Sequence, residues 1–418
     1  MIRKKLIVVG GGAAGFFCAI NAAEKYPELE VIILEKSNKI LSKVRVSGGG
    51  RCNVTHACFS ISEMINNYPR GSKFLKQAFH HFFTKDTIEW FEKRQVKLKT
   101  ESDGRMFPES NSSETIINCL LREAGRYKVN IMMNREVAGV EIFESFGSKN
   151  TFRVMLKDHS IMESDFLCIA CGGYPKADQY NWLSAFGHSF EKPVPSLFTF
   201  NVPGNSISEL MGISVENVQI KINEIKLAQR GPLLITHWGF SGPAILKLSA
   251  FGAKDLAGMN YNFTISINWL GNYNENSLQD KFRYLRNEFA SKNIINNNSF
   301  NLPRRLWLYH LKYCGISETI RWADLPSKKQ NILIKQLCSQ KFEVKGKTTF
   351  KEEFVTAGGV NLIEVNANTM ESKKVPNLFF AGEILDVDGI TGGFNFQHAW
   401  TSGWIAANSI ANILQGNN

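Results

Sequence analysis

The feature that most constrains the fold is a glycine-rich stretch near the N-terminus. Residues 6–9 are aliphatic and mostly β-branched, and residues 10–15 follow with the spacing GxGxxG. Small and apolar residues then recur at helical intervals over 13–26, where Pro27 ends the pattern. A second apolar run, 31–34, leads directly to Glu35. This order of strand, glycines, helix, strand and acid predicts a dinucleotide-binding βαβ unit.

Each element of this unit has a physical role. Gly10 makes the tight turn, Gly12 lets the backbone approach a pyrophosphate, and Gly15 lets the helix pack closely on the strand. The positive end of the helix then faces the phosphates, and Glu35 accepts the ribose hydroxyl groups. FAD and NAD are both bound in this way, so this stretch alone leaves the choice between them open.

Two later segments are also glycine-rich. Residues 47–55 contain three successive glycines followed by Arg51 and Asn53, which suits a backbone lying against a flat or anionic ligand, although a surface turn is the alternative. Residues 377–383 form an apolar run that ends in Gly382 and Glu383. Residues 392–395 then open a predicted helix, 396–414, whose N-terminus would stabilise negative charge on a reduced flavin.

The middle of the chain is different in character. Residues 196–268 alternate short apolar runs with Gly-Pro turns and predict a small β domain, whereas 273–340 are predicted to be helical around an Asn-rich loop at 293–301. Of the net charge of +11, the segment 275–347 holds +8, from 14 Lys and Arg against six Asp and Glu. Its cations alternate with aromatic residues, which indicates either a nucleic-acid surface or a solvated helix face with buried aromatics. The residues concerned are Arg304, Arg305, Trp307, Tyr309, Lys312, Trp322, Lys328 and Lys329.

Cysteine usage and hydropathy exclude several classes of protein. The eight cysteines are scattered, which favours free thiols in a reducing compartment over a disulfide framework. Cys168 and Cys171 have CxxC spacing but fall in a buried strand, and no cluster suggests a metal site. No run approaches the roughly 18 apolar residues of a membrane span. We expect a cytoplasmic protein with no membrane or metal partner.

Seven ordered motifs resemble those of one family, the BaiN/RdsA-type (YhiN-like) NAD(P)/FAD-dependent flavoproteins of bacteria. The resemblance covers nearly the whole chain and implies FAD bound by an α/β, Rossmann-like, doubly wound domain, with an inserted β-barrel-like domain and a small helical domain. We expect the FAD-binding domain at 1–195 and 350–418, the β domain at 196–270 with about 340–350, and the basic helical subdomain at 271–339. The motifs occupy 10–15 with Glu35, 47–53, 104–108, 236–243, 356–360, 369–373 and 381–397.

The resemblance also implies which residues hold the cofactor. This sequence departs from the family pattern at His56, Cys171 and His398 and is shortened after Pro175, which bears more on the substrate than on FAD. The cofactor-binding residues that we predict are Gly10, Gly12, Ala14, Gly15, Glu35, Lys36, Lys43, Gly49, Gly50, Arg51, Asn53, Gly172, Gly382, Glu383, Asp388, Gly392, Gly393, Asn395 and Phe396.

The family is associated with the reduction of carbon–carbon double bonds, in steroid enones or in uridines of large-subunit ribosomal RNA. For a uridine, the flavin N5 would give hydride to C6 while an acid protonates C5. Only one GxGxxG is present, so NAD(P)H would visit the flavin transiently or another donor would supply the electrons. Candidate catalytic donors are His237, Arg105 and Cys52. The basic segment 275–347 favours ribosomal RNA as partner; the alternatives are a small-molecule enone reductase and a non-enzymatic, flavin-stabilised RNA-binding assembly factor.

Overall fold

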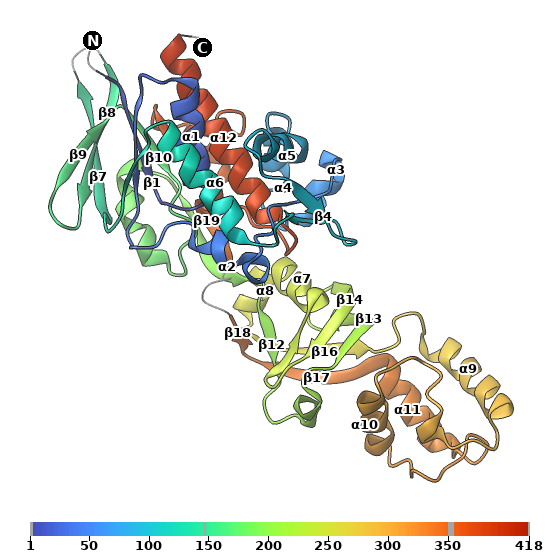
Figure 1. Cartoon of the computed structure of the whole chain (residues 1–418). Helices are drawn as coiled ribbons and strands as arrows, with labels where there is room; N and C mark the ends of the chain where they lie inside the picture. The colour runs from blue at the N-terminus through green and yellow to red at the C-terminus, as the bar shows by residue number, and fades with distance from the viewer. Residues whose placement is uncertain (1–2, 146–147, 350–354, 417–418) are drawn as a thin grey trace. The chain divides into compact units, whose positions relative to one another are not determined.

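The computed structural model describes residues 3–145, 148–349 and 355–416 (Figure 1). The chain divides into a first unit, Met1–Ser196 with Phe350–Asn418, and a second unit, Leu197–Thr349. The first unit is therefore assembled from both ends of the chain. The boundary predicted at 350 falls within 350–354, outside the described residues.

A parallel sheet of five strands forms the centre of the first unit, in the order β20-β10-β1-β2-β6. Apolar residues make up most of its three middle strands, which are buried almost throughout because helices cover a parallel sheet on both faces. This sheet confirms the predicted doubly wound α/β class. The strands are β1 (Lys5–Val9), β2 (Glu30–Leu34), β6 (Asn130–Met132), β10 (Phe166–Ile169) and β20 (Leu378–Phe380).

The first and last helices of the chain pack side by side (Figure 1). Helix α1 (Ala13–Lys25) follows the first glycine loop, and α12 (Phe394–Gln415) begins two residues before the predicted start at Phe396. A Cβ at Gly403 of α12 would lie 2.6 Å from the carbonyl oxygen of Ala14. The close approach of the two helices therefore depends on a glycine at this crossing.

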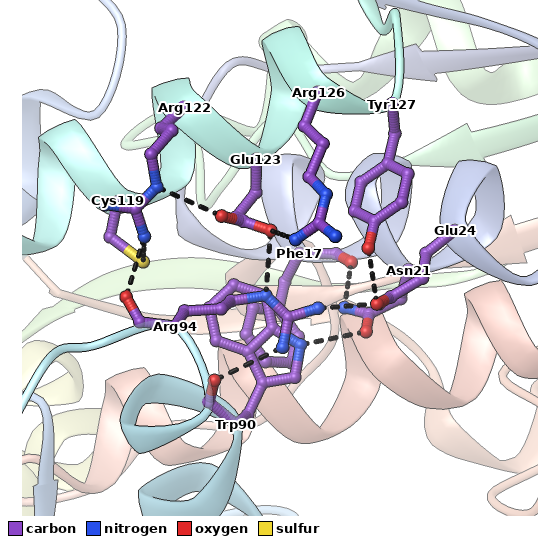
Figure 2. A network of polar contacts seen from close by, with 10 residues as sticks. All are labelled: Phe17, Asn21, Glu24, Trp90, Arg94, Cys119, Arg122, Glu123, Arg126 and Tyr127. Atoms are coloured by element: carbon purple, nitrogen blue, oxygen red, sulfur yellow. Dashed lines mark hydrogen bonds and ion pairs between the residues drawn. The ribbon is translucent and has the colours of Figure 1, made fainter.

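A buried ion cluster ties α6 (Ser113–Arg126) to its neighbours (Figure 2). Glu123 is only 3% exposed and pairs with Arg94 at 3.4 Å, Arg122 at 3.1 Å and Arg126 at 3.7 Å. The Arg94 guanidinium also lies 3.8 Å from the ring centroid of Trp90. A buried carboxylate is tolerated here because three cations surround it.

Smaller elements complete the first unit. Three minor sheets have the strand orders β3-β5-β4, β7-β8-β9 and β11-β19. Their strands are β3 (Thr55–His56), β4 (Leu98–Thr100), β5 (Arg105–Pro108), β7 (Val137–Ser145), β8 (Ser148–Leu156), β9 (Ile161–Ser164), β11 (Phe190–Ser196) and β19 (Val355–Val360). The remaining α-helices are α2 (Ser42–Gly50), α3 (Ile61–Met64), α4 (Ser72–Ala78) and α5 (Thr84–Glu92).

The second unit is built on an antiparallel sheet of seven strands, in the order β17-β16-β13-β14-β15-β12-β18. Its longer strands alternate buried and exposed residues, as expected for a sheet with one face on a core. The strands are β12 (Thr199–Asn201), β13 (Ser214–Ile222), β14 (Leu227–Ile235), β15 (Gly239–Ser241), β16 (Asn262–Asn268), β17 (Gln340–Lys345) and β18 (Lys347–Thr348).

The helices of the second unit share one hydrophobic core with this sheet, so the β and helical regions that the sequence separated lie in one unit. Trp307 and Trp322 are both fully buried in that core. For these two residues the structure supports the alternative of buried aromatic side chains. Trp307 points inward from α10, and Trp322 lies in the connection between α10 and α11. The helices are α7 (Pro243–Phe251), α8 (Ala253–Gly258), α9 (Glu275–Glu288), α10 (Arg304–Tyr313) and α11 (Ser327–Ser339).

Candidate functional site

The first glycine loop joins β1 to α1 at the carboxyl edge of the parallel sheet. Gly10 has φ +117°, and a Cβ there would lie 2.4 Å from the Ala170 carbonyl oxygen. A Cβ at Gly15 would lie 2.0 Å from the carbonyl oxygen of Gly10, whereas one at Gly12 would meet no atom within 4 Å. Two of the glycines thus allow close packing, and Gly12 faces space that a ligand could fill.

Glu35 lies directly after β2 and is turned toward this loop. One carboxylate oxygen accepts the N–H of Gly11 at 2.9 Å, and the other accepts the N–H and hydroxyl of Ser37, both at 2.9 Å. These bonds hold the acid beside the glycine loop, where it can receive ribose hydroxyl groups. The neighbouring Lys36 places its ammonium group 5.5 Å from the ring centroid of Tyr174.

The second glycine loop interrupts α2. Gly48, Gly49 and Gly50 have φ values of +59°, +69° and +85°, a left-handed run that other residues adopt at a cost. A Cβ at Gly48 would lie 2.7 Å from the ring of Phe107, but Gly49 and Gly50 face open space. This backbone is therefore bare on one side, as a flat or anionic ligand requires.

Arg51 and Asn53 follow this loop and already have protein partners. Arg51 pairs with Glu101 at 2.5 Å, and its guanidinium lies 4.0 Å from the ring centroid of Phe107. With its amide oriented to satisfy its neighbours, Asn53 accepts the N–H of Gly393 at 2.9 Å and donates to the carbonyl oxygen of Thr55 at 3.0 Å. Asn53 therefore fixes the second glycine loop to the start of α12.

The N-terminus of α12 is formed by two glycines with positive φ. Gly392 has φ +132° and Gly393 has φ +91°, and a Cβ at Gly393 would lie 2.4 Å from the Thr55 carbonyl oxygen. In the first turn, the Asn395 amide accepts from the Gly389 N–H at 2.8 Å and donates to its carbonyl oxygen at 2.9 Å. Phe396 stacks on Trp400 with ring centroids 5.8 Å apart.

The segment after β20 lies against the first glycine loop and the start of α1. Gly382 has φ +74°, and a Cβ there would lie 2.8 Å from that of Ala14. Glu383 pairs with Lys43 of α2 and accepts the N–H of Thr356 at 2.9 Å. Gly172, after β10, has φ +77° and faces open space.

Asp388 has a different environment from the other predicted cofactor residues. Its side chain is fully buried, and both carboxylate oxygens are paired with the Arg70 guanidinium. The Ser196 hydroxyl donates to one of them at 2.8 Å. Burial raises the pKa of Asp388, although Arg70 opposes that shift. These contacts give the carboxylate an internal, structural role, which sequence spacing could not reveal.

The three candidate catalytic residues lie in different surroundings. The Cys52 thiol is buried, and burial raises its pKa to about 12. Arg105 donates to Asp103 at 2.7 Å and to Glu101 at 3.1 Å. His237 is exposed in the loop between β14 and β15 of the second unit, whereas the other two belong to the first unit.

Two histidines near the predicted cofactor residues were not predicted to act. His56 has Nδ1 3.1 Å from the Gly392 carbonyl oxygen and stacks on Phe394 at 4.8 Å; burial lowers its pKa. His398, on α12, has Nε2 3.1 Å from the Gly382 carbonyl oxygen, and burial lowers its pKa to about 4. Their positions beside motif residues, where they depart from the family pattern, were the only signal in the sequence.

The described residues fit a bound dinucleotide cofactor. Glycines from three separate segments face open space at the positions where side chains would stand, namely Gly12, Gly49 with Gly50, and Gly172. The hydroxyl group of Thr356 is buried without a hydrogen-bond partner among the described residues, and it lies where a Cβ at Gly173 would approach it to 2.5 Å. A bare glycine cradle of this kind leaves room for a ligand that provides the missing contacts.

Comparison with known protein families identifies the family to which this cofactor-binding fold belongs. The model described as "HI0933-like protein Rossmann domain" matches residues 4–409. The chain belongs to the HI0933-like family. It is therefore a flavoprotein oxidoreductase, and the HI0933-like domain binds a flavin cofactor.

Three curated relatives align over almost their whole length. A ribosomal RNA dihydrouridine synthase of Escherichia coli K12 is 28% identical, covering 98% of both chains. A 3-dehydro-bile acid delta(4,6)-reductase of Clostridium scindens is 26% identical, covering 98% of this chain and 99% of the relative. A ribosomal RNA dihydrouridine synthase of Haemophilus influenzae is 27% identical, covering 97% and 98%.

Solved structures support the fold of this HI0933-like chain. A 3-ketosteroid delta1-dehydrogenase from Sterolibacterium denitrificans aligns with a TM-score of 0.50 and 12% identity, covering 98% of this chain and 99% of that one. At this identity the similarity concerns the fold alone. Within the described ranges, no helix combines the length and the apolar character needed to cross a bilayer.

Proposed function

We propose that this flavoprotein reduces the 5,6 double bond of a uridine in ribosomal RNA to give dihydrouridine. The observation that carries the proposal is the distribution of charge. The second unit, 197–349, has 19 Lys and Arg against 10 Asp and Glu, so 19 − 10 = +9 of the total +11. RNA phosphates attract a basic surface, which a small apolar substrate does not require. The names of two full-length relatives support the same reaction.

The reaction adds a hydride to C6 of the uracil ring and a proton to C5. This hydride is the chemistry that a bound FAD would supply, and we assign its two electrons to NAD(P)H as a transient donor. Negative charge develops on the carbonyl oxygen conjugated with the double bond. A hydrogen-bond donor near that oxygen therefore lowers the barrier.

We assign the holding of the cofactor to the three glycine segments and to Glu35. Gly12, Gly49 and Gly50 leave room for its phosphates and ring, and Glu35 receives its ribose hydroxyl groups. The 22-residue helix α12 has its N-cap at Gly393, and its positive N-terminal end would stabilise negative charge on the reduced flavin. Lys43 and Glu383 neutralise each other, so neither adds an isolated charge at the site.

Among the candidate donors, we assign the C5 proton to His237. Its imidazole is exposed, and histidine is the side chain that most often serves as a general acid. Arg105 is held by Asp103 and Glu101 and suits the orientation of a carbonyl oxygen. Cys52 is the least suited of the three as a proton donor, because its thiol is buried and burial raises its pKa to about 12.

The test compares ribosomal RNA from a deletion strain, its parent, and strains complemented with wild-type or Gly12→Ala protein. Nucleoside mass spectrometry should show dihydrouridine in the parent and the wild-type complement only. An unchanged dihydrouridine content in the deletion strain would contradict the proposal. With purified protein, His237→Gln should slow NAD(P)H-dependent reduction by about 100-fold or more without weakening RNA binding.

A second candidate function is reduction of a small-molecule enone. The 26% identity with a bile-acid reductase over 98% of the chain favours it. In that case a 3-keto-4-ene steroid would accelerate NAD(P)H oxidation, and RNA would have no effect. Steady-state assays with the steroid and with ribosomal RNA in parallel separate the two functions.

A further inference from the structure

The second unit contains a polar pocket of about 500 Å³. It lies between α10, α11, the start of β17 and the turn before the 3₁₀ helix Ser206–Leu210. Its volume falls within the range of small-ligand sites. Its lining consists of Gly204, Asn205, Ser206, Tyr309, Tyr313, Lys335, Gln336, Ser339, Gln340, Lys341 and Phe342.

Two tyrosines of α10 form the aromatic part of this pocket. Tyr309 and Tyr313 are four residues apart, on one face of the helix, with ring centroids 6.4 Å apart and planes inclined by 35°. Tyr313 is 60% exposed, whereas the tryptophan of the same helix, Trp307, is buried. Tyr313 therefore offers a flat, open ring at the pocket.

The charge of the pocket is uniformly positive. Lys335 of α11 and Lys341 of β17 line it, and none of the described lining residues is acidic. Neither lysine forms an ion pair with another described residue, whereas Lys345, further along the same strand, pairs with Glu343 at 3.1 Å. Two ammonium groups without carboxylates attract an anionic ligand.

The pocket also contains neutral hydrogen-bonding groups. Ser206 and Tyr309 have hydroxyl oxygens 3.5 Å apart. A hydroxyl group both donates and accepts hydrogen bonds, so these two groups can bind the polar edge of a ligand.

We propose that this pocket binds one unstacked nucleotide of single-stranded RNA. Tyr313 stacks on the base, Lys335 and Lys341 bind the flanking phosphates, and the hydroxyl groups of Ser206 and Tyr309 bind the base or the ribose 2′-hydroxyl. Aromatic stacking combined with backbone cations is the usual means of holding single strands. The proposal rests on the proposed function only in taking RNA as the ligand.

The experiment measures binding of a fluorescein-labelled single-stranded oligouridine to the full, FAD-loaded chain by fluorescence anisotropy. Tyr313→Ala should raise Kd by roughly 5- to 100-fold, and Tyr313→Trp should restore binding. Lys335→Gln and Lys341→Gln should each lower the slope of log K against log salt by roughly 0.7. A duplex of the same length should bind more weakly than the single strand.

Matched controls come from α9 of the same unit. Tyr284 is 53% exposed, and the Lys281 ammonium group lies 4.7 Å from its ring centroid. These residues form a second exposed tyrosine–lysine pair outside the pocket. Tyr284→Ala and Lys281→Gln should leave Kd and the salt slope of wild-type protein unchanged, and thermal unfolding should verify that every variant is folded.

Three results would contradict the proposal that this pocket binds RNA. The first is an equal effect of the α9 and pocket variants, and the second is no effect of Tyr313→Ala. The third is equal affinity of the protein for polyglutamate and for RNA. The last would indicate a general cationic patch that also takes acidic peptides. A failure of the RNA-binding proposal for this pocket can be distinguished from a failure of the proposed reductase function. If dihydrouridine persists in the deletion strain while Tyr313→Ala weakens RNA binding, the pocket stands and the reductase assignment fails.

Discussion

The ammonium group of Lys43 pairs with the carboxylate of Glu383, a residue 340 positions later in the chain. Glu383 also accepts the backbone N–H of Thr356. The pair therefore joins α2, which contains the second glycine loop, to the segment that follows β20. Through the N–H of Thr356 it also contacts β19. Both residues belong to the predicted cofactor set, and their contact organises that set before any ligand binds.

The energetic coupling between these two residues should be small. Because the Lys43 side chain is 47% exposed, a double-mutant cycle of Lys43→Met and Glu383→Gln should give a coupling in the free energy of unfolding below about 1 kcal/mol. Glu383→Gln alone should cost more, since its carboxylate is mostly buried and also bonded to backbone. Urea unfolding of wild type, the two single variants and the double variant measures the coupling and the cost of Glu383→Gln. A coupling well above about 1 kcal/mol would show that the ion pair is stronger than the exposure of Lys43 implies.

Gly12→Ala should separate folding from cofactor binding. The new methyl group meets no atom within 4 Å of the free protein, so thermal stability without flavin should not change. The same methyl group would occupy the space left for the pyrophosphate, so flavin affinity should fall about tenfold or more. Flavin absorbance per chain after dialysis measures the loss. Gly125→Ala in α6, which also has open space, should retain wild-type flavin content.

Stability should fall in mild acid because of His398. Burial lowers its pKa to about 4 in the folded protein, against 6.5 for an unperturbed histidine. Between these two values the unfolded chain binds a proton that the folded chain does not. The free energy of unfolding therefore decreases as pH falls from 6.5 toward 4, by about 3 kcal/mol in total.

Urea unfolding of the His398→Gln variant at several pH values checks this expectation. Glutamine cannot titrate but retains an N–H donor for the Gly382 carbonyl oxygen. The variant should show a flatter pH dependence than wild type. His80→Gln, at an exposed position, should keep the wild-type slope. Identical slopes for all three proteins would exclude His398 as the source.

Glu123→Gln should destabilise the first unit strongly. The substitution leaves the Arg94 guanidinium, which is 9% exposed, without one of its two carboxylate partners (Figure 2). Removing one member of a buried ion pair costs about 3–5 kcal/mol. Glu89→Gln, in an exposed pair with Lys93, should cost less than about 1 kcal/mol. Calorimetry of both variants tests the difference, and equal small losses would contradict a buried role.

Local sequence patterns predicted the βαβ unit well. The strand ending at Val9, the glycine spacing and the helix from Ala13 depend on neighbours within a few positions, so periodicity and turn chemistry were sufficient. The glycines that leave open space, such as Gly12, were also identified from spacing.

Long-range packing accounts for what the sequence could not predict. Asp388 was predicted to bind the cofactor from its place in a motif, but its carboxylate is taken by Arg70, which lies 318 positions earlier. For Trp307 and Trp322 the sequence left open whether the rings are exposed or buried, because their burial depends on the packing of distant segments around them. The lysines of the pocket come from α11 and β17, and the tyrosines beside them come from α10.

The division of the first unit between both chain ends sets an order of events during synthesis. The sheet lacks β20, and α1 lacks its partner α12, until residues 378–415 have left the ribosome. The second unit, 197–349, is synthesised before these two elements and has its own hydrophobic core. Because the predicted cofactor residues Gly382, Glu383 and Gly393 also follow residue 377, the cationic second unit is synthesised before the predicted flavin site is complete.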